Sequence, residues 1–178
     1  MTRTKIRFEE TCRAPREVVY DLLADLPGHL EWAGERQSEG FRLLTMDGPP
    51  GPAEVGTEFR STGSDGKKRV NVDRSVVTEA TRPSTFEFVT EGRCVTKSAG
   101  DPVCEGTYIH RYEITPTSEG SRVAYSVEVT RLHGGPANML RTPLIGRLLW
   151  RMVGSWMRKG LGNLLILAES RVTKPTLS

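Results

Sequence analysis

The sequence predicts an α+β domain, in which an antiparallel sheet carries its helices on one side. Three observations lead to this fold class. The chain reads as one strand, two short helices, a run of about six strands and one long helix. The last two strands alternate between apolar and polar residues, as in an antiparallel sheet with one face in solvent. The C-terminal segment carries apolar residues at helical spacing along one side.

The N-terminal part predicts one strand and two short helices. Lys5 to Cys12 alternates like a half-buried strand. Pro15 suits the first turn of a helix, and an apolar stripe continues from it through Asp25. Pro27 and Gly28 end that helix, and a second short helix is expected from His29 to Trp32.

The middle of the chain predicts strands separated by turns. The expected strands run over Phe41–Met46, Val55–Ser61, Lys68–Thr78, Thr85–Thr90, Val103–Thr115 and Ser121–Arg131. Asp47 to Pro52 is a loop by composition, and Ser64-Asp-Gly66 is a hairpin-turn signal. Cys94 to Asp101 is expected as a looser connection, and His133 to Ala137 as a flexible one.

The C-terminal segment predicts one long helix, from Pro143 to about Arg171. Its apolar residues lie on one side, and its arginines follow the polar side. These arginines interrupt the segment too often for a membrane span, which needs about 20 mostly apolar residues. We therefore expect a single domain over residues 1–172, followed by a flexible tail over 173–178, and no stable membrane insertion.

Composition and charge narrow the range of functions. The 178 residues carry a formal charge of +3, and the basic residues are scattered among acidic ones, which gives nucleic-acid binding little support. The N-terminus has no apolar signal region, so a cytoplasmic location is expected. Three cysteines predict free thiols, although Cys94 and Cys104 would be able to meet across a hairpin. Without a Cys/His pair at ligand spacing, we expect neither a metal nor another cofactor.

One predicted strand has an unusually polar inner face. Between Gly106 and Thr115, Arg111 and Glu113 mark one face as wet, so the interior face carries Tyr108, His110 and Tyr112. An unpaired buried hydroxyl or imidazole costs roughly 1–3 kcal/mol. Two interpretations stay open: these groups line a pocket and contact a ligand, or they hydrogen-bond to one another in a filled core.

Neighbouring elements predict a ligand-binding wall around this strand. Arg74 shares the apolar stripe of Val70 and Val76, and facing inward it would anchor a carboxylate or an enolate. A bulge near Val76 would instead turn Arg74 outward. The full set of candidate ligand-binding residues is Trp32, Phe59, Arg74, Phe86, Phe88, Tyr108, His110, Tyr112, Tyr125, Met152 and Trp156.

The element order and three short motifs resemble a known family. The string from Ala14-Pro to Glu31-Trp32, then Gly56-Thr57, then Glu119-Gly-Ser-Arg-Val123, is similar to the START-like (SRPBCC) superfamily. The chain looks most like its bacterial polyketide cyclase/dehydrase and lipid-transport branch, over nearly the whole length. This resemblance implies the helix-grip fold. In that fold a curved seven-stranded antiparallel sheet surrounds a long C-terminal helix, two short helices follow strand 1, and a hydrophobic cavity lies between sheet and helix.

The resemblance implies binding of a hydrophobic or amphipathic small molecule, lipid- or polyketide-like, for transport, sensing or sequestration. Access to the cavity is expected between residues 47–52 and 133–143. The alternative is a polyketide cyclase, aromatase or dehydratase acting on a carbonyl substrate. In that case His110 would be the acid or base, Tyr112 or Tyr108 a hydrogen-bond donor, and Arg74 the enolate clamp. Either a monomer or a homodimer is expected.

A third class of function, binding to a membrane surface or a partner, follows from the basic amphipathic segment 139–159. A helix-grip fold needs the apolar face of this segment for its own sheet, so this class is the least favoured of the three.

Overall fold

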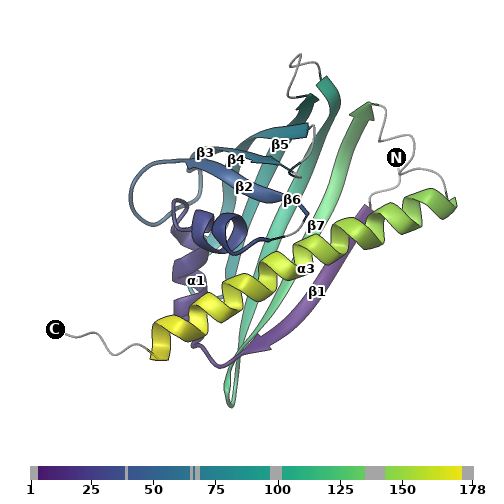
Figure 1. Ribbon diagram of the computed structural model, residues 1–178. Coiled ribbons are helices and arrows are strands. Elements are labelled where there is room, and N and C mark those ends of the chain that lie inside the picture. The colour runs from purple at the N-terminus through teal and green to yellow at the C-terminus, as the bar shows by residue number, and fades with distance from the viewer. Residues whose placement is uncertain are drawn as a thin grey trace.

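A curved antiparallel sheet with a long helix lying across its concave face makes up the fold (Figure 1). The computed structural model describes residues 4–38, 40–64, 66, 69–96, 102–134 and 143–173. The elements are β1 (Thr4–Cys12), α1 (Arg16–Ala24), η1 (Leu30–Glu35), β2 (Arg42–Asp47), β3 (Glu58–Ser64), β4 (Arg69–Thr81), β5 (Thr85–Thr96), β6 (Pro102–Thr117), β7 (Gly120–Gly134) and α3 (Pro143–Thr173).

The described strands form one seven-stranded sheet in the order β1-β7-β6-β5-β4-β3-β2. Neighbouring strands are antiparallel, and the N-terminal strand β1 pairs with β7, from Thr4 opposite Val129 to Cys12 opposite Ser121. The helix α3 runs beside β1 and across the sheet, while α1 lies near its C-terminal end (Figure 1). The expected fold class, an α+β helix-grip arrangement, is confirmed.

The segment after β1 matches the expectation only in part. The first short helix is present as α1, but the second is a π-helix that runs from Leu30 to Glu35 rather than from His29 to Trp32. Gly34 lies in this π-helix, and a Cβ there would come within 2.8 Å of the carbonyl oxygen of Leu43. The missing side chain therefore lets the helix approach the β2 backbone closely.

Two strands extend into segments that were expected to be connections. β5 continues through Cys94 to Thr96, and β7 continues through His133 to Gly134, where loose connections were expected. The extension follows from pairing, because Cys94 lies opposite Cys104 and Cys104 lies opposite Gly134. The rest of both expected connections, at 97–101 and 135–142, lies outside the described residues, as does the expected tail from residue 174.

The core fills the end of the grip where α1 and the C-terminal half of α3 meet the sheet. Phe86 is fully buried at its centre and meets the ring of Tyr20 edge to face, with 6.0 Å between ring centroids. The other fully buried large side chains are Val19, Leu23, Leu26, Val77, Ile114, Val123, Val127, Leu161, Leu164 and Leu167. Burying each such side chain contributes about 1.5–3 kcal/mol, so this end of the fold is held by close packing.

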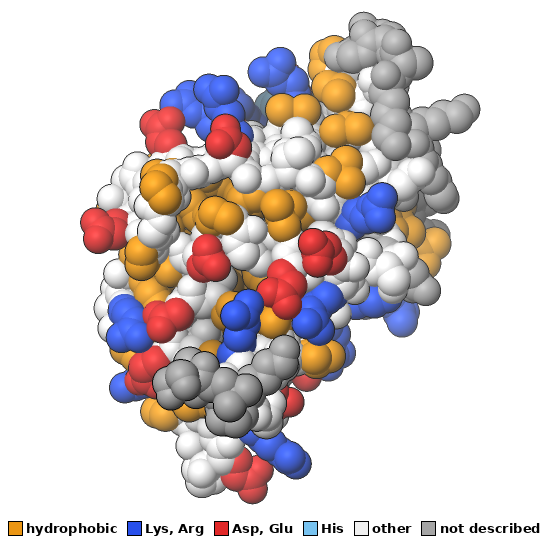
Figure 2. Space-filling view, turned by 60° about the vertical axis from the view of Figure 1, so that its left-hand side comes forward, with side chains coloured by type: hydrophobic (Ala, Val, Ile, Leu, Met, Phe, Trp, Pro, Cys, Tyr) orange, Lys and Arg blue, Asp and Glu red, His pale blue; other side chains and the backbone are white. Residues whose placement is uncertain are grey.

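Charged groups of both signs are interspersed on the face shown in Figure 2, with apolar side chains between them. Within the described part of the chain, no helix combines the length and the hydropathy that a bilayer crossing requires.

Candidate functional site

The polar stripe on β6 faces the concave side of the sheet. His110 lies between Phe88 of β5 and Val127 of β7 in the strand register. Its ring stacks on that of Phe88 at 4.7 Å between centroids, and a hydrogen bond of 2.9 Å joins its Nδ1 to the hydroxyl of Tyr125. Burial lowers the pKa of His110 to about 4, so the imidazole is neutral at physiological pH.

Tyr112 belongs to the closed end of the concave face. Its ring stacks on that of Tyr125 at 4.3 Å between centroids, and both side chains are buried. Burial raises the pKa of Tyr112 well above its ordinary value. For Tyr112, Tyr125 and His110, the polar inner face is therefore explained by contacts within the protein. Tyr108 of the same strand has its ring 6.5 Å from that of His110 between centroids, but its hydroxyl makes no hydrogen bond among the described residues.

Tyr108 lies in a more open and more polar part of the concave face. Asp73 of β4 and Tyr108 of β6 are both half-buried and share this inner face. Burial raises the pKa of Asp73 to about 7. It also raises the pKa of Tyr108, with smaller contributions from Cys104 and Asp73. A carboxyl group that titrates near neutrality on an accessible inner face is a marker of functional sites.

Hydroxyl and thiol groups surround this pair. Ser75 and Thr90 lie between the polar region and the aromatic stack, and their hydroxyls are hydrogen-bonded to each other at 2.8 Å. Cys94 and Cys104 lie directly opposite each other as half-buried thiols. The sequence predicted free cysteines able to meet across a hairpin, and the strand register agrees with that. Asp73 was not among the predicted site residues.

Arg74 lies on the other side of the sheet from this region. Its guanidinium is exposed and donates a 2.8 Å hydrogen bond to Glu58 on the neighbouring strand. Ser75 and Val77 are buried, so the residues of odd number in β4 face inward, up to the bulge between Val77 and Glu79. The inward placement of Arg74 is therefore wrong: its valine stripe lies on the convex face, and Val72 is 48% exposed.

The helical wall also differs from the prediction. Met152 is 43% exposed, whereas Met157 packs against the core from the same helix. Trp156 is half-buried and covers Gly40, so close that a Cβ at this glycine would overlap its indole ring. The inner face of α3 follows the spacing of Met157, Leu161 and Leu164, and Met152 falls outside that face.

The remaining predicted residues lie on the inside. Phe59 and Phe86 are buried, and Phe88 packs against the core. Trp32 is buried beside the His29 ring, with 4.8 Å between centroids, and its indole N–H has no hydrogen-bond partner among the described residues. The concave face thus brings together Phe59, Phe86, Phe88, Tyr108, His110, Tyr112 and Tyr125.

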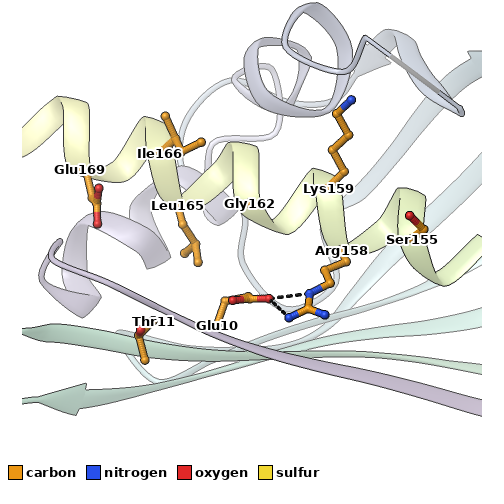
Figure 3. A pocket seen from close by; sticks show the side chains of 9 residues that line it. All are labelled: Glu10, Thr11, Ser155, Arg158, Lys159, Gly162, Leu165, Ile166 and Glu169. Atoms are coloured by element: carbon orange, nitrogen blue, oxygen red, sulfur yellow. Dashed lines mark hydrogen bonds and ion pairs between the residues drawn. The ribbon is translucent and has the colours of Figure 1, made fainter.

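A separate groove of about 500 Å³ lies between β1 and α3, away from the predicted residues. Figure 3 shows that Arg158 reaches down from α3 and pairs with Glu10 of β1 at 2.6 Å. The groove is lined by Glu10, Thr11, Ser155, Arg158, Lys159, Gly162, Leu165, Ile166 and Glu169. Ion pairs this exposed stabilise a fold by less than about 1 kcal/mol, so the pair ties the helix to the sheet edge only weakly.

Comparison with known proteins agrees with this geometry. A protein from Mesorhizobium loti is 16% identical and superposes with a TM-score of 0.63, over 97% of this chain and 100% of its own. An uncharacterized protein from Rhizobium leguminosarum is 14% identical with a TM-score of 0.62, over 95% and 96% of the two chains. A protein from Thermus thermophilus is 21% identical with a TM-score of 0.57, over 95% and 97%. These likenesses show the shared fold.

No curated protein matches the chain. At the level of sequence, the profile of one family, described as polyketide cyclase/dehydrase and lipid transport, matches residues 3–169. The match takes in every strand and most of the long helix, and so it covers both the closed end and the more open part of the concave face. The chain belongs to the polyketide cyclase/dehydrase and lipid transport family.

Proposed function

We propose that the protein binds a hydrophobic or amphipathic small molecule on the concave face, for transport, sensing or sequestration. The observation that carries this proposal is the gradient of burial along that face. Phe86 and Ile114 at one end are 0% and 2% exposed, whereas Asp73, Tyr108 and Cys104 towards the other end are half-buried. An apolar wall with a few polar groups that remain accessible is typical of small-molecule sites.

The aromatic rings are suited to the apolar body of such a ligand. Phe88, His110 and Tyr125 form a continuous stack, with centroid separations of 4.7 and 6.2 Å. Because His110 is neutral and already hydrogen-bonded to Tyr125, the stack presents ring faces and edges rather than a charge. A lipid- or polyketide-like molecule would gain dispersion contacts and apolar burial there.

Two tryptophan variants of the same strand test this proposal. Asn71 faces the open half of the concave face, whereas Val72, the next residue, is exposed on the convex face. The probe is N-phenyl-1-naphthylamine, an uncharged apolar fluorophore, titrated into each protein. We expect Asn71→Trp to weaken binding at least about tenfold, since it fills the space that a ligand needs. We expect Val72→Trp to bind like the wild type.

If both variants bind the probe equally well, the ligand binds at another surface, such as the groove between β1 and α3. Absence of binding by the wild-type protein would overturn the proposal as a whole. Circular dichroism of both variants controls for folding.

A second candidate function is an acid/base enzyme of the cyclase, aromatase or dehydratase type acting on a carbonyl substrate. One observation favours it: the pKa of Asp73 is about 7, and the phenol of Tyr108 lies on the same face. A general base works best with a pKa near the working pH. Solvent-deuterium exchange at the α-carbon of 2-tetralone, followed by NMR, would detect such a base. Exchange catalysed by the wild type and lost in Asp73→Asn would support the enzyme over the carrier.

A further inference from the structure

Two glycines that lie opposite each other on β5 and β6 form a patch that has no side chains of its own, in the more open part of the concave face near Asp73 and Tyr108. Gly92 of β5 lies directly opposite Gly106 of β6. A Cβ at Gly92 would come within 2.6 Å of Oδ1 of Asp73, and a Cβ at Gly106 would overlap the hydroxyl of Tyr108. The carboxyl group therefore lies over one glycine and the phenol over the other. Cβ positions of directly opposed residues are about 4.5–5.5 Å apart, so both polar groups converge on one small area.

Neither converging group is hydrogen-bonded within the part of the chain that the structure describes. Among the residues that the structure describes, the carboxylate of Asp73 and the hydroxyl of Tyr108 have no hydrogen-bond partner. Burial alone raises the pKa of Asp73 to about 7. A partly desolvated polar group without a hydrogen-bond partner destabilises the protein, so a bound molecule that pairs with both groups offsets that cost.

The charges around the patch favour one kind of ligand head. Besides Asp73, the described titratable groups nearest the patch are the thiols of Cys94 and Cys104, the phenol of Tyr108 and the neutral His110, whereas Tyr112 and Tyr125 lie at the closed end of the face. Arg69, at the start of β4, is exposed at the rim. Apart from this rim arginine, the described inner face of β3 to β7 presents no lysine or arginine, because Arg74 points outward to Glu58. Among the described residues of these strands, an anionic head would therefore meet the Asp73 carboxylate with no cation on the inner face to compensate it.

We propose that Asp73 and Tyr108 bind the polar head of the ligand, and that this head is a hydrogen-bond donor, a protonated amine or a hydroxyl, rather than a carboxylate or phosphate. The inference rests on the proposed binding function and specifies its ligand class. The carboxylate of Asp73 accepts from the donor, and the hydroxyl of Tyr108 holds the same group from the neighbouring strand. The apolar body then lies along the stack of Phe88, His110 and Tyr125.

Three probes that share one ring system test the head-group preference. They are 1-naphthylmethylamine, 1-naphthalenemethanol and 1-naphthoic acid, titrated by fluorescence at about pH 8, where Asp73 is mostly ionised. For the wild type we expect the amine to bind most tightly, then the alcohol, then the acid. Asp73→Asn should weaken the amine about 30-fold, because removing one partner of a buried charge pair costs about 2 kcal/mol or more. The alcohol should change only a few-fold.

Two further variants separate charge from placement. Gly92→Ala keeps the carboxylate but displaces it, since the new Cβ would overlap Oδ1, and it should lower the preference for the amine in the same direction. Asp47→Asn removes an exposed carboxylate from β2 and should leave all three affinities unchanged.

The failures of the two proposals are distinguishable. If the acid binds as tightly as the amine, or if Asp73→Asn leaves the order intact, this inference is overturned while the binding function stands. If none of the three probes binds to the wild type, the binding function fails and this inference with it.

Discussion

Replacing Asp73 by asparagine should change how the stability of the protein depends on pH. The pKa of Asp73 is 3.8 in an unfolded chain and about 7 in the fold, where burial disfavours its charge. The folded state therefore holds the proton more tightly, and the free energy of unfolding falls as pH rises from about 4 to about 7. With about 1.4 kcal/mol for each tenfold change in proton affinity, the loss between pH 5 and pH 8 is roughly 2.5 kcal/mol. Asparagine does not titrate and avoids this loss.

Urea denaturation of both proteins at pH 5 and at pH 8 measures this difference. Because the two proteins differ only at residue 73, the contributions of all other groups cancel when the variant is compared with the wild type. Between pH 5 and pH 8, we expect the free energy of unfolding of Asp73→Asn to rise by about 2.5 kcal/mol relative to that of the wild type. In Asp47→Asn, which changes an exposed carboxylate, the free energy of unfolding should change with pH as it does in the wild type. If the free energy of unfolding changes equally with pH in all three proteins, the idea that the Asp73 carboxyl is desolvated in the fold is refuted.

Two other substitutions test the description of the fold. His29 is buried, its Nε2 lies 2.8 Å from the carbonyl oxygen of Leu23, and burial lowers its pKa to about 4. Its contribution to stability is present above pH 6.5 and is lost as pH falls towards 4, so His29→Gln should remove roughly 3 kcal/mol of acid sensitivity, measured by urea denaturation at pH 4 and pH 7. If His29→Gln loses as much stability between pH 7 and pH 4 as the wild type does, this explanation is wrong. Arg74→Ala should leave the urea midpoint nearly unchanged and leave probe binding intact, because its pair with Glu58 is exposed. A loss of probe binding in this variant would show that Arg74 contacts the ligand.

The fold was predictable because its signals are long and repeated. The alternation in β7 puts Val123, Tyr125, Val127 and Val129 on one buried face, as expected. Period-two alternation fixes which face is buried as long as the strand stays regular. In β4 the same reasoning leaves the face open, since valine is favoured on either side of a pleated sheet and a valine stripe does not by itself mark the buried side. The bulge between Val77 and Glu79 became visible only through pairing with β5.

The candidate site was predictable on β6 and less so on its neighbours. His110 and Tyr108 stood out because polar residues interrupted an inner face. Asp73 was hidden by the wrong phase of β4. Another signal was present in the sequence: Gly92 and Gly106 lie inside strands, where glycine often marks the close approach of another group. Which side chains would lie over these glycines depends on register, and register comes from pairing across three strands rather than from any one segment.

The pairing of β1 with β7 also bears on the order in which the protein folds during synthesis. Thr4 finds its partner only once Val129 has been made, and α3 follows later still. Contacts between such distant positions are slow to form, because the intervening chain must be closed into a loop first. Until then the aromatic face of β5 and β6 has α1 but not α3 to cover it, and strands exposed in this way are prone to aggregation. The unfinished chain would therefore depend on chaperones that shield apolar surfaces, and expression at lower temperature should raise the yield of folded protein.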